Sequence, residues 1–410
     1  MQHIKADFLI IGAGIIGLTL AWNLRKVYPY KKIIVIEKEK DIGAHGSGRN
    51  SGVLHAGFYY TPDSLKAKFT KQGNFELTKY CEEKGLKINK CGKVVVAESE
   101  EDFENLFELK RRGDKNGVEL QLIDEKELKE IEPNAKTYQY ALWSPTTSTV
   151  DPSEILTSLK KDLELSGVDF YFNTPYQSNL DSNSIIAGDK IFTAEKIINA
   201  AGLYADKIAK DFGFSKDYVI IPFKGIYLEH TGDKKFISCN IYPVPNIKNP
   251  FLGVHFTIKV DGTIKIGPTA IPCFWRENYS GFERFNLKEF VEIFKWESLL
   301  FLKNSGFRRL AFEEVKKYIK SYLLKEASRL VKQFPAKEFN KWGTPGIRAQ
   351  LLNVKTLKLE HDFIIEGDKN SVHILNAVSP AFTASLPFTR YVIEKYIIEE
   401  NYSNGEIQKD

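Results

Sequence analysis

Cysteine is scarce in this chain, and long apolar runs are missing. The 410 residues include 4 cysteines, and no two of them form a CxxC pair. This spacing fits neither a disulfide framework nor a zinc site. We therefore expect the cysteines to be free thiols in a reducing cytoplasm, and we expect no bound metal. No run of about 18 apolar residues occurs, which predicts that no helix crosses a membrane. The N-terminus enters an apolar run almost at once, so we expect no signal or transit peptide.

Charge of one sign is not concentrated anywhere along the sequence. The formal net charge is +5, and the lysines are scattered without a long basic block. Nucleic-acid binding is therefore not expected. The mild positive excess fits an anionic substrate or an anionic membrane surface, but over 410 residues it is weak evidence for either. Repeats and low-complexity segments are also missing, and a chain of this length predicts two domains.

The most specific local signal lies in the first forty residues. An apolar run, Phe8 to Ile11, precedes the sequence GAGIIG at 12–17, and helical spacing follows it. A second apolar run, 32–36, ends in Glu37, about 20 positions after the last glycine of the loop. This order of strand, glycine loop, helix, strand and acidic residue is typical of dinucleotide binding. A tight strand-to-helix turn without a ligand is the alternative.

Each part of this unit has a physical role. Gly12 permits the tight turn, Gly14 lets a pyrophosphate approach the backbone, and Gly17 lets helix and strand pack closely. The helix N-terminus offers free N–H groups and partial positive charge to phosphates. Glu37 can accept hydrogen bonds from ribose hydroxyls. The position of the unit at the start of the chain, and the lack of a second GxGxxG, favour FAD over NAD.

Later segments are predicted to return to this first domain. Segment 167–176 reads as a strand, and 196–199 as another strand that ends in small residues. These residues, Ala200, Ala201 and Gly202, would let a cofactor lie against the backbone, or they mark a close helix–strand contact.

Two more strands are predicted near the C-terminus, at 363–366 and 372–375. Ser379 and Pro380 then open a helix, with Ser379 as the N-cap and Pro380 in the first turn. A helix start aimed at a flavin would stabilise negative charge on the reduced ring. An ordinary capped helix is the alternative.

The intervening segments predict a second domain. Alternating or aromatic-rich strands indicate a mostly antiparallel sheet; they are 93–100, 222–230, 251–260 and 262–270. Residues 282–334 show amphipathic helical spacing. We therefore expect an α/β (α+β) fold, with a Rossmann-type FAD-binding domain and a substrate domain built on a mostly antiparallel sheet plus helices. The expected segments are 1–85, 146–215 and 340–400 for the FAD-binding domain, 86–145 and 216–339 for the substrate domain, and 401–410 for a tail.

The sequence resembles the D-amino-acid-oxidase-like FAD-dependent oxidoreductases, and within them the L-2-hydroxyglutarate dehydrogenase/oxidase family. The resemblance is carried by IGAGIIGLTLAWNL (11–24), HGSGRNSGVLHAGFYYTPDSLKAKFTKQGN (45–74), INAAGLYAD (198–206), IYPVPNIKNPFLGVHFTIKVDGTIKIGPTA (241–270), GIRAQLL (346–352) and LNAVSPAFTASL (375–386). The stretches 45–74 and 241–270 are characteristic of the hydroxyglutarate enzymes. The resemblance implies FAD-dependent oxidation of L-2-hydroxyglutarate, a 2-hydroxy dicarboxylate, to 2-oxoglutarate.

This chemistry assigns roles to particular side chains. Hydride must reach flavin N5, a base must take the hydroxyl proton, and cations must hold the carboxylate. His55 and His255 are the candidate bases because histidine titrates near neutrality, although each could be a hydrogen-bonded structural residue. His45 is a weaker candidate, with a cofactor contact as its alternative. Arg348 is predicted to clamp a carboxylate bidentately, with an interdomain ion pair as the alternative.

Further contacts follow from the resemblance and the motifs. The expected substrate-binding residues are Tyr60, Lys224 and Arg49. The expected cofactor-binding residues are Gly12, Gly14, Ile16, Gly17, Glu37, Lys38, Ser47, Asn50, Ser51, Gly52, Ala200, Ala201, Gly202, Ser379, Pro380 and Ala381. Oxygen or a quinone would accept the electrons. The protein would be cytoplasmic, and peripheral contact with the inner face of the cell membrane is a further possibility. An amine or amino-acid oxidase and a non-catalytic flavoprotein subunit are the alternatives.

Overall fold

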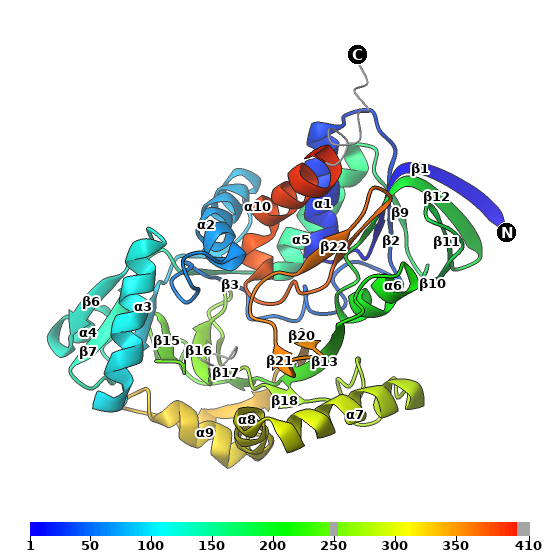
Figure 1. Ribbon diagram of the computed structural model, residues 1–410. Coiled ribbons are helices and arrows are strands. Elements are labelled where there is room, and N and C mark those ends of the chain that lie inside the picture. Colours follow the sequence, from blue (N-terminus) through cyan, green and yellow to red (C-terminus); the bar gives the residue numbers. More distant parts are fainter. Residues whose placement is uncertain (247–252, 400–410) are drawn as a thin grey trace. The chain divides into compact units, whose positions relative to one another are not determined.

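The contacts within the chain define two compact units. A computed structural model describes residues 1–246 and 253–399 (Figure 1). The first unit contains Met1–Gly48, Pro152–Ile220 and the segment that starts at Ala349. The second unit contains Arg49–Asp151 and Ile221–Arg348. The chain passes between them four times, and two of these passages lie within strands, β13 (Tyr218–Gly225) and β20 (Gly346–Asn353).

The first unit is built on a sheet with a parallel centre. Its eight strands are β1 (Gln2–Ile11), β2 (Ile33–Ile36), β9 (Asp169–Tyr171), β10 (Tyr176–Asn179), β11 (Ser184–Ala187), β12 (Lys190–Asn199), β22 (Ile365–Gly367) and β23 (Ser371–Ile374). The order β12-β1-β2-β9 is parallel throughout, and β23 pairs in parallel with the end of β12. Every residue of β2 is buried, as expected for a parallel strand covered on both faces. This arrangement confirms the expected Rossmann-type domain.

Helices cover this sheet. They are α1 (Ile15–Val27), α5 (Pro152–Leu165), α6 (Ala205–Asp211) and α10 (Ala381–Ile393), with short turns η2 (Gly202–Tyr204) and η4 (Glu394–Ile398) and the small strand β21 (Lys358–Leu359). Helices α5 and α10 lie beside α1 (Figure 1). The amide of Asn23 on α1 donates to Leu386 O and Thr389 Oγ1 on α10, each at 2.9 Å. A polar bond therefore fixes two otherwise apolar helices against each other.

The second unit contains a mostly antiparallel sheet, also of eight strands. Its strands, in spatial order, are β19 (Phe339–Trp342), β14 (Leu228–His230), β17 (Ile264–Gly267), β16 (His255–Ile258), β15 (Asn240–Pro243), β5 (Lys93–Val96), β7 (Tyr140–Ser144) and β6 (Gln121–Asp124). Only the β15–β5 pairing among them is parallel. Val94, Ile241, Phe256 and Ile266 belong to one buried apolar cluster. Because successive side chains of a strand point to opposite faces of the sheet, the residues between these apolar ones lie on the other face.

Short strands and helices complete the second unit. The strands β3 (Val53–Leu54), β8 (Ser148–Val150) and β4 (Ile88–Asn89) form a small sheet, and β18 (Ile271–Pro272) pairs with β13. The helices are α2 (Leu65–Lys84), α3 (Phe103–Lys115), α4 (Glu125–Ile131), α7 (Leu287–Lys303), α8 (Ser305–Lys316) and α9 (Lys320–Ser328), with turns η1 (Glu100–Asp102) and η3 (Ala336–Glu338).

Several predicted elements differ in detail from the structure. Ser379 is not an N-cap: α10 begins at Ala381, its N-cap residue is Pro380, and the Ala381 N–H bonds instead to Val378 O at 3.0 Å. The strand expected at 93–100 ends at Val96, where a turn leads to α3. The first segment of the first unit ends at Gly48, before the predicted position 85, because β3 and α2 belong to the second unit. The start of the strand expected at 251–260 and the tail 401–410 lie outside the described residues.

Candidate functional site

The glycine loop of the first unit packs tightly against the end of a neighbouring strand. Gly12 has φ +107°, and a Cβ at this position would lie 2.7 Å from Ala200 O. A Cβ at Gly17 would lie 1.9 Å from Gly12 O. A larger residue at Gly12 would therefore push the loop away from the end of β12, and one at Gly17 would push α1 away from the loop. The small residues predicted at 12–14 and 200–202 lie together at the carboxyl ends of parallel strands, where α/β sheets bind nucleotides.

Side chains close this loop through hydrogen bonds. Glu37 Oε2 accepts from Ala13 N at 2.8 Å, and Ser47 Oγ accepts from Ile15 N at 2.9 Å. A carboxylate has about four acceptor positions, so Glu37 can hold the loop and accept from a ribose as well. The loop geometry and the acidic residue therefore fit the pyrophosphate and ribose of a dinucleotide such as FAD.

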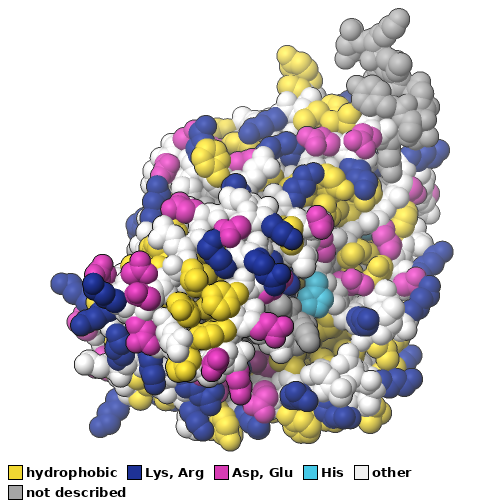
Figure 2. All heavy atoms as spheres, turned by 60° about the vertical axis from the view of Figure 1, so that its left-hand side comes forward, with side chains coloured by type: hydrophobic (Ala, Val, Ile, Leu, Met, Phe, Trp, Pro, Cys, Tyr) yellow, Lys and Arg dark blue, Asp and Glu magenta, His cyan; other side chains and the backbone are white. Residues whose placement is uncertain are grey.

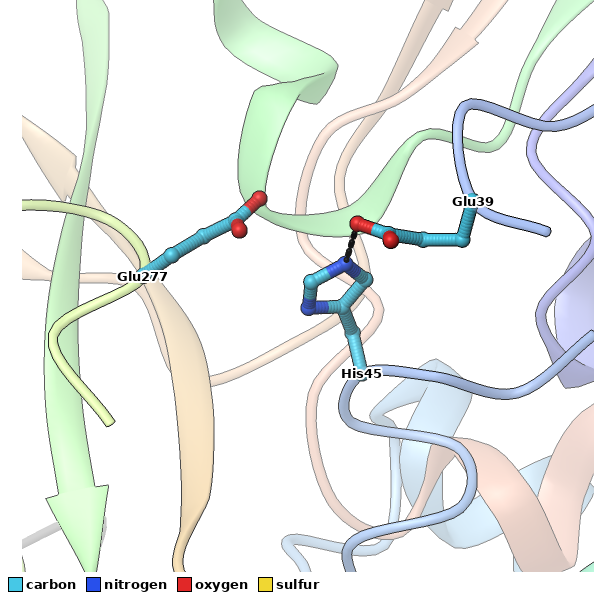
Figure 3. A group of neighbouring side chains, drawn as sticks. All are labelled: Glu39, His45 and Glu277. Carbon is cyan, nitrogen blue, oxygen red and sulfur yellow. Dashed lines mark hydrogen bonds and ion pairs between the residues drawn. The ribbon is translucent and has the colours of Figure 1, made fainter. Parts of the chain in front are cut away.

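The segment after β2 is tied together by charge. His45 Nε2 and Glu39 Oε1 lie 2.9 Å apart (Figure 3). Lys38 forms an ion pair with the same Glu39 carboxylate. The structure thus gives His45 and Lys38 a shared partner within the first unit, and a cofactor contact for either remains a prediction.

The remaining predicted cofactor residues fall in two places. Asn50, Ser51 and Gly52 belong to the second unit, where Asn50 Oδ1 accepts from Gly52 N at 2.8 Å in a local turn. Ser379, Pro380 and Ala381 lie at the start of α10 in the first unit. For both groups of residues, contact with the cofactor remains a prediction.

The second unit brings the two candidate bases into one electrostatic neighbourhood. His55 follows β3, and Asn74 on α2 fixes its backbone by donating to Leu54 O at 3.0 Å and to His55 O at 3.3 Å. Burial holds the pKa of His55 well below its ordinary value, and positive charge acts in the same direction. That charge comes from Lys93, His255 and Arg348. His55 is therefore neutral at physiological pH.

His255 has a defined orientation at the start of β16. Its Nδ1 lies 2.9 Å from Gly253 O, and its ring stacks on Tyr242 with centroids 3.7 Å apart. A carbonyl only accepts, so Nδ1 carries the proton and Nε2 presents the lone pair. Burial lowers the pKa of His255 to about 3, with the charges of Lys93 and Lys265 acting in the same direction and the Gly253 bond opposing them.

Arg348 and Tyr60 supply a cation and a hydroxyl beside the histidines. Burial lowers the pKa of Arg348 to about 10, and Tyr60 opposes this effect. Arg348 therefore stays charged at neutral pH. Both side chains keep part of their surface accessible, whereas His55 and His255 are only 7% and 4% exposed. Arg348 and Tyr60 are the members of the group that a small anion can reach first.

Lys93 is the member of this group that the sequence did not reveal. It begins β5, is 0% exposed, and lies with Nζ 4.6, 4.5 and 4.7 Å from the ring centroids of Phe58, Tyr59 and Tyr242. Burial lowers its pKa to about 7. The sequence signal for a buried Lys93 was its position at the start of an otherwise apolar run, KVVV. The same pattern is equally typical of a lysine at a solvent-exposed strand end.

The sheet register explains why these residues meet. Tyr242 pairs with Val95, two residues from Lys93 on the same face of β5. Ile241 pairs with Phe256, so Tyr242 is opposite His255. The same alternation sends Val94 and Phe256 to the apolar core. One face of the sheet therefore carries Lys93, Tyr242 and His255.

Two further predicted substrate contacts, Lys224 and Arg49, belong to segments next to β20, the strand of Arg348. Lys224 lies on β13, which neighbours β20 in its sheet, and its Nζ is 5.9 Å from the ring centroid of Tyr318. Burial lowers the pKa of Lys224, and Cys273 opposes this effect. Arg49 stacks over Tyr279 at 4.3 Å and donates to Pro345 O at 3.4 Å. A Cβ at Gly346 of β20 would lie 2.2 Å from Arg49 O, so Arg49 packs against the strand that carries Arg348, and a substrate contact for Lys224 or Arg49 remains a prediction.

Comparison with known proteins identifies the class. Residues 7–394 match the family model described as FAD dependent oxidoreductase. The FAD-bound L-α-glycerophosphate oxidase of Mycoplasma pneumoniae superposes with a TM-score of 0.75 at 23% identity, over 95% of this chain and 94% of that chain. Glycine oxidase of Geobacillus kaustophilus superposes with a TM-score of 0.71 at 18% identity, over 97% and 95%. The chain belongs to the FAD dependent oxidoreductase family, and FAD is its cofactor.

Sequence relatives narrow the comparison within this family. The chain is 35% identical to the mitochondrial L-2-hydroxyglutarate dehydrogenase of Mus musculus, over 94% of this chain and 87% of that protein. It is 32% identical to the L-2-hydroxyglutarate dehydrogenase of Escherichia coli K12, over 95% and 92%. These relatives match nearly the whole chain, including both units.

Proposed function

We propose that this protein oxidises L-2-hydroxyglutarate to 2-oxoglutarate. The observation that carries the proposal is the group formed by His55, His255, Arg348 and Tyr60, in a chain whose relatives are L-2-hydroxyglutarate dehydrogenases. The glycine loop 12–17, Glu37 and Ser47 would hold FAD. When bound, FAD supplies the hydride acceptor at N5. The residues of the second unit then hold the substrate and take its hydroxyl proton.

In this proposal His255 is the base. Its Nδ1 bond to Gly253 leaves the Nε2 lone pair for the proton of the substrate hydroxyl. A pKa of about 3 makes His255 a weak base before substrate binds. A substrate with two carboxylates would bring negative charge beside the ring, and an opposite charge at short range favours the protonated form. Binding of the dianion would therefore raise the pKa of His255 toward the range in which a base works well.

Arg348 is proposed to hold a substrate carboxylate. Its guanidinium is charged and partly accessible, and its fork matches a carboxylate in a bidentate pair. Tyr60 lies beside it and can donate its hydroxyl to the same anion. This clamp would fix the C2–H bond of the substrate for transfer, which is the main contribution that positioning makes to rate.

The test is an anaerobic substrate screen of the purified flavoprotein. We expect L-2-hydroxyglutarate to bleach the oxidised flavin absorbance, because it combines a hydroxyl for the proposed base His255, a C–H bond for hydride transfer and a carboxylate for the proposed clamp Arg348. The product, 2-oxoglutarate, is the control that binds without donating hydride. Bleaching by amino acids, with none by L-2-hydroxyglutarate, would instead establish an amino-acid oxidase, a class represented among the structural neighbours by glycine oxidase.

A membrane quinone is the proposed electron acceptor, and the second unit carries an apolar surface suited to reach one. On α7 the outward side chains Leu287, Val291, Phe294 and Leu302 are 65%, 59%, 50% and 71% exposed. A second patch involves the mutually contacting rings of α3 and β7, on the side brought forward in Figure 2, where hydrophobic side chains gather among charged side chains of both signs. No described helix is long and apolar enough to span a membrane. Contact through such a surface would be peripheral.

A further inference from the structure

Lys93 is a buried charge that the proposed reaction does not yet use. The side chain is 0% exposed, and among the residues that the structure describes Nζ has no hydrogen-bond acceptor. Burying an ammonium costs free energy unless something compensates the lost hydration. An unbranched apolar residue such as methionine would fill the same space without that cost. The charge therefore calls for an explanation beyond packing.

The three rings around Nζ compensate part of this cost. Phe58, Tyr59 and Tyr242 lie within 4.7 Å of the ammonium, and the electron-rich faces of aromatic rings attract a cation. The attraction favours the charged form and opposes the burial that lowers the pKa of Lys93 to about 7. At any pH at which a buried histidine would begin to protonate, Lys93 is charged.

The same ring cage connects Lys93 to both histidines. Tyr242 forms one wall of the cage and stacks on His255 at 3.7 Å. Phe58 and Tyr59 come shortly after His55 in the chain, separated from it by Ala56 and Gly57. The positive charge of Lys93 lowers the pKa of each histidine, after the larger effect of burial. The two candidate bases thus share one fixed cation.

We propose that Lys93 is a positioning residue of the oxidation, whose caged ammonium keeps His55 and His255 unprotonated until the dianionic substrate binds. The inference rests on the proposed function, because it concerns the base of that reaction. Around His55 the other cation is Arg348, with the neutral ring of His255 beside it, and around His255 the other cation is Lys265, which is 7% exposed and lies 4.4 Å from the ring centroid of Tyr227. These cations act in the same direction as Lys93, and Lys93 is the cation that acts on both histidines.

The sign of the expected effect follows from the charge. Flavin reduction requires an unprotonated base, so its rate falls as the pH drops through the pKa of that base. Lys93 lowers this pKa and keeps the base available in mild acid. Removing the charge should raise the pKa and move the acid limb of the rate profile to higher pH. For charges several ångströms apart in a protein interior, the expected displacement is about one pH unit.

The experiment compares the holoenzyme with Lys93→Met and Lys93→Arg. The rate of flavin reduction by L-2-hydroxyglutarate is measured anaerobically from about pH 5 to pH 9, a span that covers the ordinary histidine range. We expect the acid limb to move up by about one pH unit in Lys93→Met and to stay with the wild type in Lys93→Arg, which keeps the charge. An acid limb unchanged in Lys93→Met, or moved equally in both variants, would overturn the inference. Wild-type enzyme that L-2-hydroxyglutarate does not reduce would instead overturn the proposed function.

A second measurement does not depend on turnover. The imidazole resonances of His55 and His255 are followed by NMR against pH in histidine-labelled protein without substrate, and assigned with His55→Gln and His255→Gln. We expect both rings to stay neutral to lower pH in the wild type than in Lys93→Met. If Lys93→Met does not fold, the comparison is made with Lys93→Gln, which is neutral and polar. Identical titration of both rings with and without the lysine charge contradicts the inference.

Discussion

At the scale of single residues, one hydrogen bond selects the reactive nitrogen of His255. The bond to Gly253 O places the proton on Nδ1 and turns Nε2 toward the role of acceptor. The stacked Tyr242 ring holds the plane of the imidazole. His55 shares the electrostatic neighbourhood, and its backbone is held by Asn74. His255 is the ring whose reactive nitrogen and plane are defined by contacts, to Gly253 and Tyr242.

This difference leads to a prediction for the histidine pair. His255→Gln should slow flavin reduction by about 10² or more, the range expected when a general base is lost. His55→Gln should have a smaller effect, because the variant removes a neighbouring ring and leaves the base. Single-turnover stopped-flow absorbance measures both. A larger loss in His55→Gln than in His255→Gln would assign the base to His55.

At the scale of elements, the β1–loop–α1 unit depends on the close approach of backbone to backbone. The helix begins directly after the glycine loop, with Gly14 as its N-cap, and its interior side is almost entirely buried. The space that Gly17 leaves against Gly12 O allows this packing. Any shift of α1 would move the N–H groups that a pyrophosphate requires.

Gly17→Ala should therefore weaken FAD binding. A Cβ 1.9 Å from Gly12 O forces the helix to move, and we expect most of the flavin to be lost on gel filtration. The flavin-to-protein absorbance ratio measures the loss, and far-UV circular dichroism checks that the chain is folded. Gly213→Ala is the matched control in the same unit, since Gly213 has φ +86° and open space around a Cβ. Equal flavin content in the two variants would contradict the prediction.

Strand pairing in the second unit works at the same scale. Lys93, Tyr242 and His255 come from β5, β15 and β16, and the parallel β15–β5 pairing sets their common face. A shift of one residue in either pairing would send one of these side chains to the apolar core. The register is specified by the opposite face, where Val94, Ile241 and Phe256 must be buried.

At the scale of the whole molecule, the exposed apolar side chains of α7 are the surface through which the proposed membrane contact would be made. Exposed apolar patches on this scale commonly mark interaction sites. We expect the holoenzyme to sediment with vesicles of phosphatidylcholine and phosphatidylglycerol, and less with phosphatidylcholine alone, because lysines lie among the apolar residues.

A variant pair makes this prediction specific. Val291→Glu places a negative charge in the apolar stripe of α7 and should reduce sedimentation several-fold. Val27→Glu is the control, since Val27 is also exposed, at 44%, but belongs to the first unit. Equal sedimentation of the two variants would exclude α7 as the contact. Lack of sedimentation by the wild type would favour oxygen or a protein carrier as acceptor.

Much of the first unit could be predicted because its signals are local. The glycine loop, its flanking strands and Glu37 lie within about thirty residues, where turn geometry and apolar periodicity act directly. The cap at Ser379 was wrong because a backbone bond to Val378 took the place of the side chain. The substrate contacts of Lys224 and Arg49 remain predictions, because residue type and motif do not encode which strand face or loop a side chain occupies.

The sequence by itself determined the dinucleotide unit and the mostly antiparallel second sheet, and it named His55, His255 and Arg348 as candidates for the chemistry. Only the tertiary structure decided that Lys93 joins them. Its position depends on pairings between strands about 150 residues apart in the chain, which no local pattern encodes. The three surrounding rings cage the ammonium, and the exclusion of water strengthens its effect on neighbouring groups while it lowers the pKa of Lys93 itself.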